Sequence, residues 1–133
     1  MTNVSSSSAM TALRSALRRV PGAETAGRKV LQKLLYQVPC SERPLVSIII
    51  PVYGHWKETF ACLKAVAETA GNIPYEIIAV DDCSPDSTGK KLDRIIGLRV
   101  VHMPKNGGFI RACNTGLQHA RGEIIVYLNN DTE

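Results

Sequence analysis

Residues 45–52 read LVSIIIPV, a short run in which branched apolar side chains follow one another almost without a break. Such a run suits a strand of a parallel sheet that is covered on both faces, because a half-exposed strand would alternate apolar and polar residues. Three later segments have the same character: YEIIAV at 75–80, LRVVHM at 98–103 and EIIVYL at 123–128. We therefore expect four strands, of which 45–52 is the first.

Segments with the apolar spacing of helices separate these strands. They are 56–71 (WKETFACLKAVAETAG), 86–97 (DSTGKKLDRIIG) and 108–122 (GFIRACNTGLQHARG), and each ends on a glycine, the preferred residue just past a helix end. Gly116, inside the last of them, is expected to permit close packing. Strand and helix in alternation predict βαβ units with right-handed crossovers. We predict an α/β, Rossmann-like fold with a parallel sheet in the order 3-2-1-4.

Length and composition are those of an ordinary globular domain. The chain has 133 residues, of which 44% are apolar and 21% charged, and its net charge is +4. We expect no nucleic-acid partner. No apolar run approaches the roughly 20 residues of a membrane span, and the N-terminus lacks the apolar core of a signal peptide. The four cysteines form no CxxC pair and no zinc spacing, so we expect reduced thiols and a cytoplasmic location.

Residues 1–43 are expected to form an N-terminal extension that precedes a domain starting at residue 44. Residues 1–9 contain SSSS and are predicted to be disordered, while 10–20 and 28–38 carry apolar stripes with helical spacing. Such stripes more often dock on protein than on lipid. Arginine and lysine are frequent in this region, so weak peripheral contact with the inner face of a membrane is the alternative.

Each predicted strand ends in polar or turn-forming residues. The four ends read PVYG, DDCSPD, PKNGG and NND. In a doubly wound sheet the ligand crevice opens beyond the carboxyl ends of the strands, where the chain reverses direction. The functional site is therefore expected on that edge, among these four loops.

Two of the loops carry candidates for binding a nucleotide. Asp81 and Asp82 end the second strand, where a carboxylate can accept hydrogen bonds from a nucleobase imide or a ribose hydroxyl. A turn with a helix cap explains Asp86 and Ser87 but not two adjacent carboxylates, which repel each other. We therefore favour ligand binding for Asp82. Tyr53 could flank a base, although a tyrosine at a strand end is often only packing.

The other two loops carry a cation and a further carboxylate. Arg111 stands near the first turn of the third helix, whose N-terminal amides favour phosphate. Asp131 follows the fourth strand, and a lone carboxylate suits Mg²⁺ or Mn²⁺ when phosphates supply further ligands. Asn129 and Asn130 could orient that site or contact a ribose. An ordinary turn is the alternative for NNDT, because asparagine and aspartate tolerate left-handed conformations.

Together these segments resemble the N-terminal half of an inverting family 2 glycosyltransferase with a GT-A fold. The matching pieces are VSIIIPVYG, EIIAVDDCSPDST, NGGFIRACNTGLQHARGE and IIVYLNNDTE, which cover residues 45–133 in the family's order and spacing. The LNNDT ending resembles rhamnosyltransferases and other enzymes of O-antigen or cell-wall polysaccharide synthesis. Two features depart from the family pattern: DDCSPDS replaces the commoner DDGSTDGT, and the metal motif keeps one acid.

The resemblance implies a role for each matching residue. Pro51, Tyr53 and Asp82 would line the base pocket, and Asp131 would close the DxD-type motif and hold Mg²⁺ or Mn²⁺. The donor would be a nucleotide-diphospho-sugar and the acceptor a glycan or a lipid-linked glycan. A second half after Glu133 would supply the catalytic base, so this chain would be an inactive fragment that carries the donor-binding half.

Two other functions compete with sugar transfer. A nucleotidyltransferase has a similar sheet but needs a glycine-rich basic loop directly after the first strand, and PVYGHW lacks one. A non-catalytic nucleotide-binding or interaction module is the stronger rival, because the catalytic half is missing.

Overall fold

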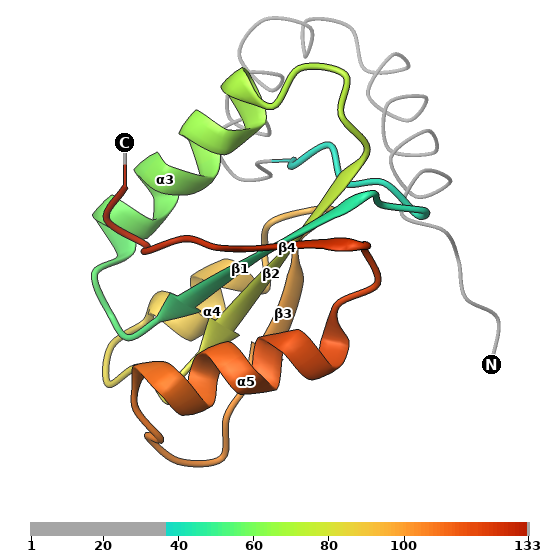
Figure 1. The fold of residues 1–133 in the computed structure, drawn as a ribbon. Coiled ribbons are helices and arrows are strands. Elements are labelled where there is room, and N and C mark those ends of the chain that lie inside the picture. Colours follow the sequence, from blue (N-terminus) through green and yellow to red (C-terminus); the bar gives the residue numbers. More distant parts are fainter. Residues whose placement is uncertain (1–36, 133) are drawn as a thin grey trace, which may run out of the picture. The chain divides into compact units, whose positions relative to one another are not determined.

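The computed structural model describes residues 37–132 (Figure 1). Residues 1–36, where the disordered segment and most of the amphipathic helices are expected, lie outside the described residues, as does Glu133. The predicted alternation of strands and helices is confirmed. The elements are β1 (Val46–Val52), α3 (Trp56–Thr69), β2 (Tyr75–Asp81), α4 (Thr88–Leu92), β3 (Arg99–His102), α5 (Phe109–His119) and β4 (Ile124–Tyr127).

The four strands form one parallel sheet in the order β3-β2-β1-β4, which confirms the predicted topology. β1 pairs with β2 along its whole length, from Val46 opposite Tyr75 to Val52 opposite Asp81. β3 pairs with the last residues of β2, so that Asp81 lies opposite His102. These strands end at the same level, and their loops are therefore brought together at one edge of the sheet.

β4 lies beside β1 but pairs only with its first half. Val46 lies opposite Ile124 and Ile49 opposite Tyr127, and the amide of Leu128 donates to the carbonyl of Ile49 at 3.0 Å. Beyond that point the chain leaves the sheet and runs past the first turns of α3 (Figure 1). The polar segment that follows β4 is therefore positioned by a helix and not by the sheet.

α5 packs on one face of the sheet (Figure 1). Ala112 is fully buried there against Ile49, Ile78 and Val80. Gly116 lies one turn further along the helix, and a Cβ at this position would collide with Cγ2 of Ile49. The close packing predicted for Gly116 is confirmed, because the helix approaches the sheet more closely than a larger side chain would permit.

The opposite face of the sheet is covered as well. Ile50 and Ile77 point away from α5 and are fully buried, as are Leu63 of α3 and Leu92 of α4. Coverage on both faces explains the nearly continuous apolar runs of β1 and β2. β4 differs from this expectation, because Ile124, Val126 and Tyr127 are 50%, 38% and 46% exposed. In residues 37–132 no helix combines the length and the apolar character needed to cross a membrane. All four cysteines are free thiols.

α4 is much shorter than the helix predicted for 86–97. It spans only Thr88–Leu92, and the residues that follow pair with chain that precedes β1. The amide of Val38 donates to the carbonyl of Ile96 at 2.8 Å. Gly97 has φ +86°, and a side chain there would collide with the carbonyl oxygen of Val38. This pairing, which the helical spacing of the sequence does not reveal, ends the helix early.

Candidate functional site

The loops after β1 and β2 are bonded to each other at the carboxyl edge of the sheet. The amide of Asp82 donates to the carbonyl of Val52 at 2.8 Å, which extends the pairing of the two strands. Further out, the amide of Gly54 donates to Oγ of Ser84 at 2.8 Å. Tyr53 lies between Val52 and Gly54, and both of these neighbours are hydrogen-bonded to the loop after β2. The backbone of Tyr53 is therefore fixed relative to that loop.

Tyr53 presents an open ring at this edge. It is 50% exposed, whereas Pro51 is buried within β1. After Tyr53 the backbone turns through left-handed conformations at Gly54, with φ 66°, and at His55, with φ 56°. The carbonyl of His55 then accepts the amide of Thr59 at 3.0 Å and so begins α3. The ring of Tyr53 is therefore accessible to a ligand, while Pro51 shapes the end of the strand.

The Asp82 carboxylate binds the start of α5. Asp82 is 4% exposed, and its two oxygens accept the amides of Gly107 at 2.6 Å and Gly108 at 2.8 Å. Gly108 is the N-cap residue of α5 and has φ 82°. A helix N-terminus favours an anion, and here that anion is the carboxylate of Asp82. Two amides predicted to favour phosphate are thus occupied, although each oxygen of Asp82 keeps a lone pair that can accept a further bond.

Asp81 has separate partners. It is 6% exposed; its Oδ1 accepts the amide of Ser84 at 3.0 Å, and its Oδ2 lies 2.9 Å from Nδ1 of His102. Burial alone would raise the pKa of Asp81, but the hydrogen bonds from Ser84 and His102 outweigh burial and lower it. Gly89 of α4 makes room for this carboxylate, because a Cβ there would collide with Oδ2. The adjacent acids are tolerated because each is bonded to different donors.

The segment after β4 is attached to α3. The side-chain amide of Asn130 donates to Oγ1 of Thr59 at 2.9 Å. The thiol of Cys62 lies 3.5 Å from the carbonyl of Asn129, whose side chain is exposed. Thr59 and Cys62 belong to the first turns of α3, which begins directly after the β1 loop. The segment therefore reaches the same edge of the sheet as Asp82.

Asp131 is exposed at the end of this segment. Burial is the main cause of the raised pKa of the Cys62 thiol, and the negative charge of Asp131 adds to it. Among residues 37–132 no three His, Cys, Asp or Glu side chains converge to hold a metal ion. A single exposed carboxylate fits a weakly held Mg²⁺ or Mn²⁺ whose other ligands are phosphate and water, and does not fit a metal held by protein alone.

Arg111 lies in the first turn of α5 and is exposed. Its Cβ and Cδ lie 3.1 Å from the point that a Cβ of Gly107 would occupy, so the side chain runs across this glycine. The structure therefore places a cation beside the amides that Asp82 binds. The loops of Tyr53 and Asp82 and the start of α5, which carries Arg111, are bonded to one another. The segment that carries Asp131 reaches the edge separately.

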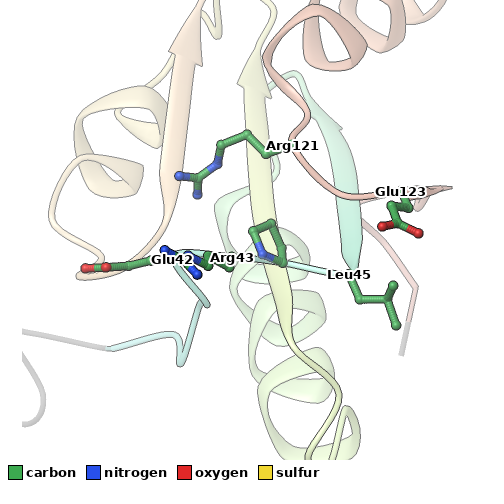
Figure 2. Close-up of a pocket in the computed structure, with 6 residues that line it drawn as sticks. Glu42, Arg43, Leu45, Arg121 and Glu123 are labelled. Atoms are coloured by element: carbon green, nitrogen blue, oxygen red, sulfur yellow. The ribbon is translucent and has the colours of Figure 1, made fainter.

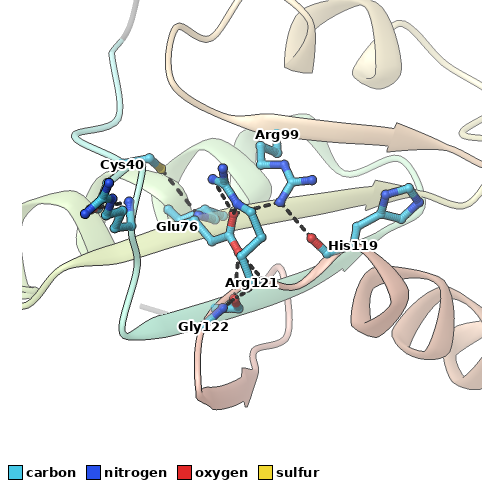
Figure 3. Close-up of polar contacts among 10 residues, drawn as sticks. Cys40, Glu76, Arg99, His119, Arg121 and Gly122 are labelled. Atoms are coloured by element: carbon cyan, nitrogen blue, oxygen red, sulfur yellow. Dashed lines mark hydrogen bonds and ion pairs between the residues drawn. The ribbon is translucent and has the colours of Figure 1, made fainter.

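A buried ionic network that was not predicted from the sequence lies at the opposite edge, where the strands begin (Figure 3). Glu76 of β2 is fully buried. Its carboxylate accepts the hydroxyl of Ser47 at 2.7 Å, Nη1 of Arg99 at 2.8 Å, and the amide and Nε of Arg121 at 2.8 and 3.0 Å. Burial alone would raise the pKa of Glu76, but these bonds lower it to about 2. A carboxylate inside an apolar strand is the signal that predicts such partners.

A pocket of 470 Å³ opens beside this network (Figure 2). It is lined by Glu42, Arg43, Pro44, Leu45, Arg121 and Glu123. These residues precede β1 and β4, so the pocket lies at the edge away from Tyr53 and Asp82. Its charged side chains are of both signs, and Nη2 of Arg121 is already bonded to Glu76 at 2.8 Å. The pocket is therefore not part of the candidate site.

The sheet order, with an acidic loop at the carboxyl edge and a carboxylate beyond the fourth strand, defines the chain as a domain of the GT-A class of glycosyltransferases. The chain belongs to glycosyl transferase family 2, whose family model matches residues 47–133. This confirms the family resemblance seen in the sequence.

The chain is similar to several members of known function class and known structure. Glycosyltransferase GlyG of Streptococcus pneumoniae is 35% identical over 92 residues, which are 65% of this chain and 30% of GlyG. S. aureus TarS 1–349 in complex with UDP-GlcNAc has a TM-score of 0.56 and 30% identity, over 65% of this chain and 26% of that TarS segment. The mannosyltransferase PcManGT from Pyrobaculum calidifontis, in complex with GDP-Man and Mn²⁺, has a TM-score of 0.58 and 28% identity, over 91% of this chain and 38% of PcManGT. The chain thus spans 26% to 38% of the GlyG, TarS 1–349 and PcManGT chains.

Proposed function

We propose that the chain is the donor-binding part of an inverting glycosyltransferase, which transfers a sugar from a nucleotide-diphospho-sugar to an acceptor hydroxyl. The observation that carries this proposal is the polar edge of the sheet, where the loops of Tyr53 and Asp82 meet the first turn of α5, which carries Arg111. Family membership supports the reaction class. The UDP-GlcNAc bound by TarS and the GDP-Man bound by PcManGT support the class of donor.

Each residue of the edge has a role in this proposal. The ring of Tyr53 flanks the base, at the end of the strand that Pro51 shapes. Asp82, fixed by the amides of Gly107 and Gly108, accepts a bond from the base or the ribose with a remaining lone pair. Arg111 attracts the diphosphate, because a guanidinium forms charge-assisted hydrogen bonds to phosphate oxygens.

Asp131 is the residue proposed to hold a divalent ion, Mg²⁺ or Mn²⁺. Asn130 holds the segment against α3, and the exposed side chain of Asn129 is free to orient the ion's ligands or to contact the ribose. Such an ion, when bound, neutralises the departing diphosphate. The Mn²⁺ in the PcManGT complex supports the use of a divalent ion.

The proposed acceptor is a hydroxyl of a glycan or of a lipid-linked glycan in polysaccharide synthesis, and the proposed sugar is a hexose or rhamnose. Residues 44–133 would form the first part of the GT-A domain and 1–43 an extension. No residue of this chain is assigned as the catalytic base. The chain spans 26% to 38% of the GlyG, TarS 1–349 and PcManGT chains that it resembles. A nucleotide-binding module without transfer activity remains the rival function.

Donor binding and sugar transfer are measured separately to test this function. UDP-GlcNAc or GDP-mannose should bind the chain in the presence of Mg²⁺. Tyr53→Ala should weaken binding by roughly 1–3 kcal/mol, the contribution of an aromatic ring stacked on a base. Tyr127→Ala is the matched control, because Tyr127 is 46% exposed, close to the 50% of Tyr53, but lies on β4.

The outcomes separate the possible functions. If neither nucleotide sugar binds, the proposed function is rejected. We expect no transfer from this chain alone, so transfer would show that it contains its own catalytic base. Equal losses from Tyr53→Ala and Tyr127→Ala would contradict the role given to Tyr53.

A further inference from the structure

His102, the last residue of β3, contacts a carboxylate with each of its ring nitrogens. Nδ1 lies 2.9 Å from Oδ2 of Asp81, at the end of β2, and Nε2 lies 2.9 Å from Oδ1 of Asp93, the C-cap residue of α4. The side chain of Asp93 is 54% exposed, whereas that of Asp81 is 8% exposed. One imidazole therefore joins a buried acid of the candidate site to an exposed acid of a neighbouring helix.

This geometry defines the protonation state of the ring. A neutral imidazole has one N–H donor, and its other nitrogen is an acceptor. Ionised carboxylates only accept hydrogen bonds, so with both acids ionised the two contacts of 2.9 Å are both hydrogen bonds only in the imidazolium form of the ring. Hydrogen bonding to Asp93, and then to Asp81, raises the pKa of His102. Lys91, a basic residue in the last turn of α4, directs its Nζ to the ring of Trp56, 5.4 Å from the ring centroid.

The imidazolium is connected to the candidate donor site through Asp81. The second oxygen of Asp81 accepts the amide of Ser84 at 3.0 Å, and Oγ of Ser84 accepts the amide of Gly54 at 2.8 Å. Gly54 directly follows Tyr53, and Asp81 directly precedes Asp82. Hydrogen bonds therefore connect His102 with the loops after β1 and β2, the two loops that the proposed function assigns to nucleotide binding.

We propose that His102, as an imidazolium, is a positioning residue that holds these two loops in their donor-binding arrangement. The proposal rests on the donor-binding function proposed above. When the ring loses a proton, one contact loses its donor and Asp81 loses the positive charge that compensates its burial. The loops then lose their common support, and donor affinity falls.

The sign of the pH dependence follows from the raised pKa of His102. The stabilising effect is fully present below the ordinary histidine pKa of about 6.5, and it is lost as pH rises through the higher pKa of the folded protein. Affinity for a nucleotide sugar should therefore be highest in mildly acidic solution. It should fall about tenfold above the pKa of His102, the effect of losing one charge-assisted hydrogen bond.

The experiment measures dissociation constants of UDP-GlcNAc and GDP-mannose, with Mg²⁺, between about pH 5.5 and 8.5. Their diphosphate groups do not titrate in this range, so changes in affinity report on the protein. The ring protons of His102 are followed by NMR on the same samples. In the wild type, the midpoint of the affinity loss should coincide with the titration of His102.

Two variants make the test specific. Asp93→Asn removes the exposed partner and leaves Asp81 and the loops untouched, so it should move the midpoint of both titrations to lower pH. His102→Gln should bind weakly and without a midpoint in this range. His119→Gln replaces an exposed histidine at the end of α5 and should behave like the wild type.

The results distinguish this inference from the proposed function. If neither nucleotide sugar binds at any pH, both fail. Affinity that does not change while His102 titrates, or a midpoint that Asp93→Asn does not move, would overturn the role of His102 and leave the proposed function intact.

Discussion

Asp81 and Asp82 are neighbours in the sequence but bind different parts of the molecule. Asp82 is bonded to the amides at the start of α5, and Asp81 to His102 and the amide of Ser84. Alternation along a strand explains the division, because successive side chains leave a strand on opposite sides. Each carboxylate is therefore bonded to its own donors, and the two can be tested separately.

The first prediction concerns Asp82. Asp82→Ala should weaken the binding of UDP-GlcNAc or GDP-mannose by roughly 1–3 kcal/mol, because a buried charge-assisted hydrogen bond and the support of the α5 N-terminus are both lost. Titration calorimetry measures the change. Glu42→Ala, which removes an exposed carboxylate at the opposite edge, is the control. Unchanged affinity in a folded Asp82→Ala variant would remove Asp82 from the site.

The second prediction concerns Glu76, whose pKa is lowered to about 2. A lowered pKa stabilises the fold at pH values above the ordinary pKa of glutamate, about 4.3, and the stabilisation is lost as pH falls from there toward 2. The free energy of unfolding should therefore decrease by about 3 kcal/mol over this interval. Urea denaturation at a series of pH values measures it.

Glu76→Gln supplies the comparison for that measurement. The amide keeps the shape of the side chain but cannot titrate, so the variant should be less stable at neutral pH and should lose this part of the acid dependence. Glu42→Gln, an exposed position, should keep the wild-type profile. An identical acid dependence in Glu76→Gln and wild type would show that other carboxylates control the acid unfolding.

At the scale of elements, the contact between α5 and the sheet depends on a glycine inside a helix. Helix propensity alone favours alanine over glycine by about 1 kcal/mol. A Cβ on Gly116, however, would collide with Ile49 and lie 3.0 Å from Cγ2 of Val80, and both residues are fully buried in the centre of the sheet. Packing and propensity therefore make opposite predictions for the same substitution.

We expect packing to decide the outcome. Gly116→Ala should destabilise the protein by about 1–3 kcal/mol, the usual cost of adding a methyl group to a tightly packed core. Gln118→Ala, at an exposed position of the same helix, should change stability little. Chemical denaturation compares the two. A more stable Gly116→Ala protein would mean that α5 can move away from the sheet at little cost.

At the scale of the whole molecule, the candidate site combines segments that are far apart in the sequence. The loops after β1 and β2 are bonded together, and α5 is attached to them by Asp82. The segment after β4 reaches the same edge by a different route, through Thr59 and Cys62 of α3. Asp131 therefore depends on α3 for its position. In its proposed role, a bound diphosphate would supply the other ligands of a metal ion.

The corresponding prediction is that metal and nucleotide bind together. Mn²⁺ should bind weakly to the chain alone and more tightly with UDP or GDP, because one carboxylate supplies too few ligands. Asp131→Asn should abolish this nucleotide-dependent gain. Glu123→Gln, which removes an exposed carboxylate just before β4, should retain it. Electron paramagnetic resonance of Mn²⁺ measures the free ion. If Asp131→Asn keeps the gain, Asp131 is only a turn residue.

The sequence by itself determined the order of elements and the parallel sheet, and it indicated the edge on which the candidate site is proposed. These properties follow from local patterns, since unbroken apolar runs, helical spacing and terminal glycines act over a few residues. Gly116 and the acidic pair Asp81 and Asp82 were recognised for the same reason. Their partners were not recognised, and the length of the helix predicted for 86–97 was wrong.

Tertiary structure alone decided which polar groups meet. Glu76 lies beside Arg121 only because the start of β2 and the turn before β4 are at the same edge of the sheet. His102 lies between Asp81 and Asp93 only because β3 ends beside β2 and α4. Hydrogen bonds between side chains act over about 3 Å and join residues that may be dozens of positions apart. The sequence therefore shows that a charged residue in an apolar strand will be buried and will need partners. The packing of the strands determines which residues those partners are.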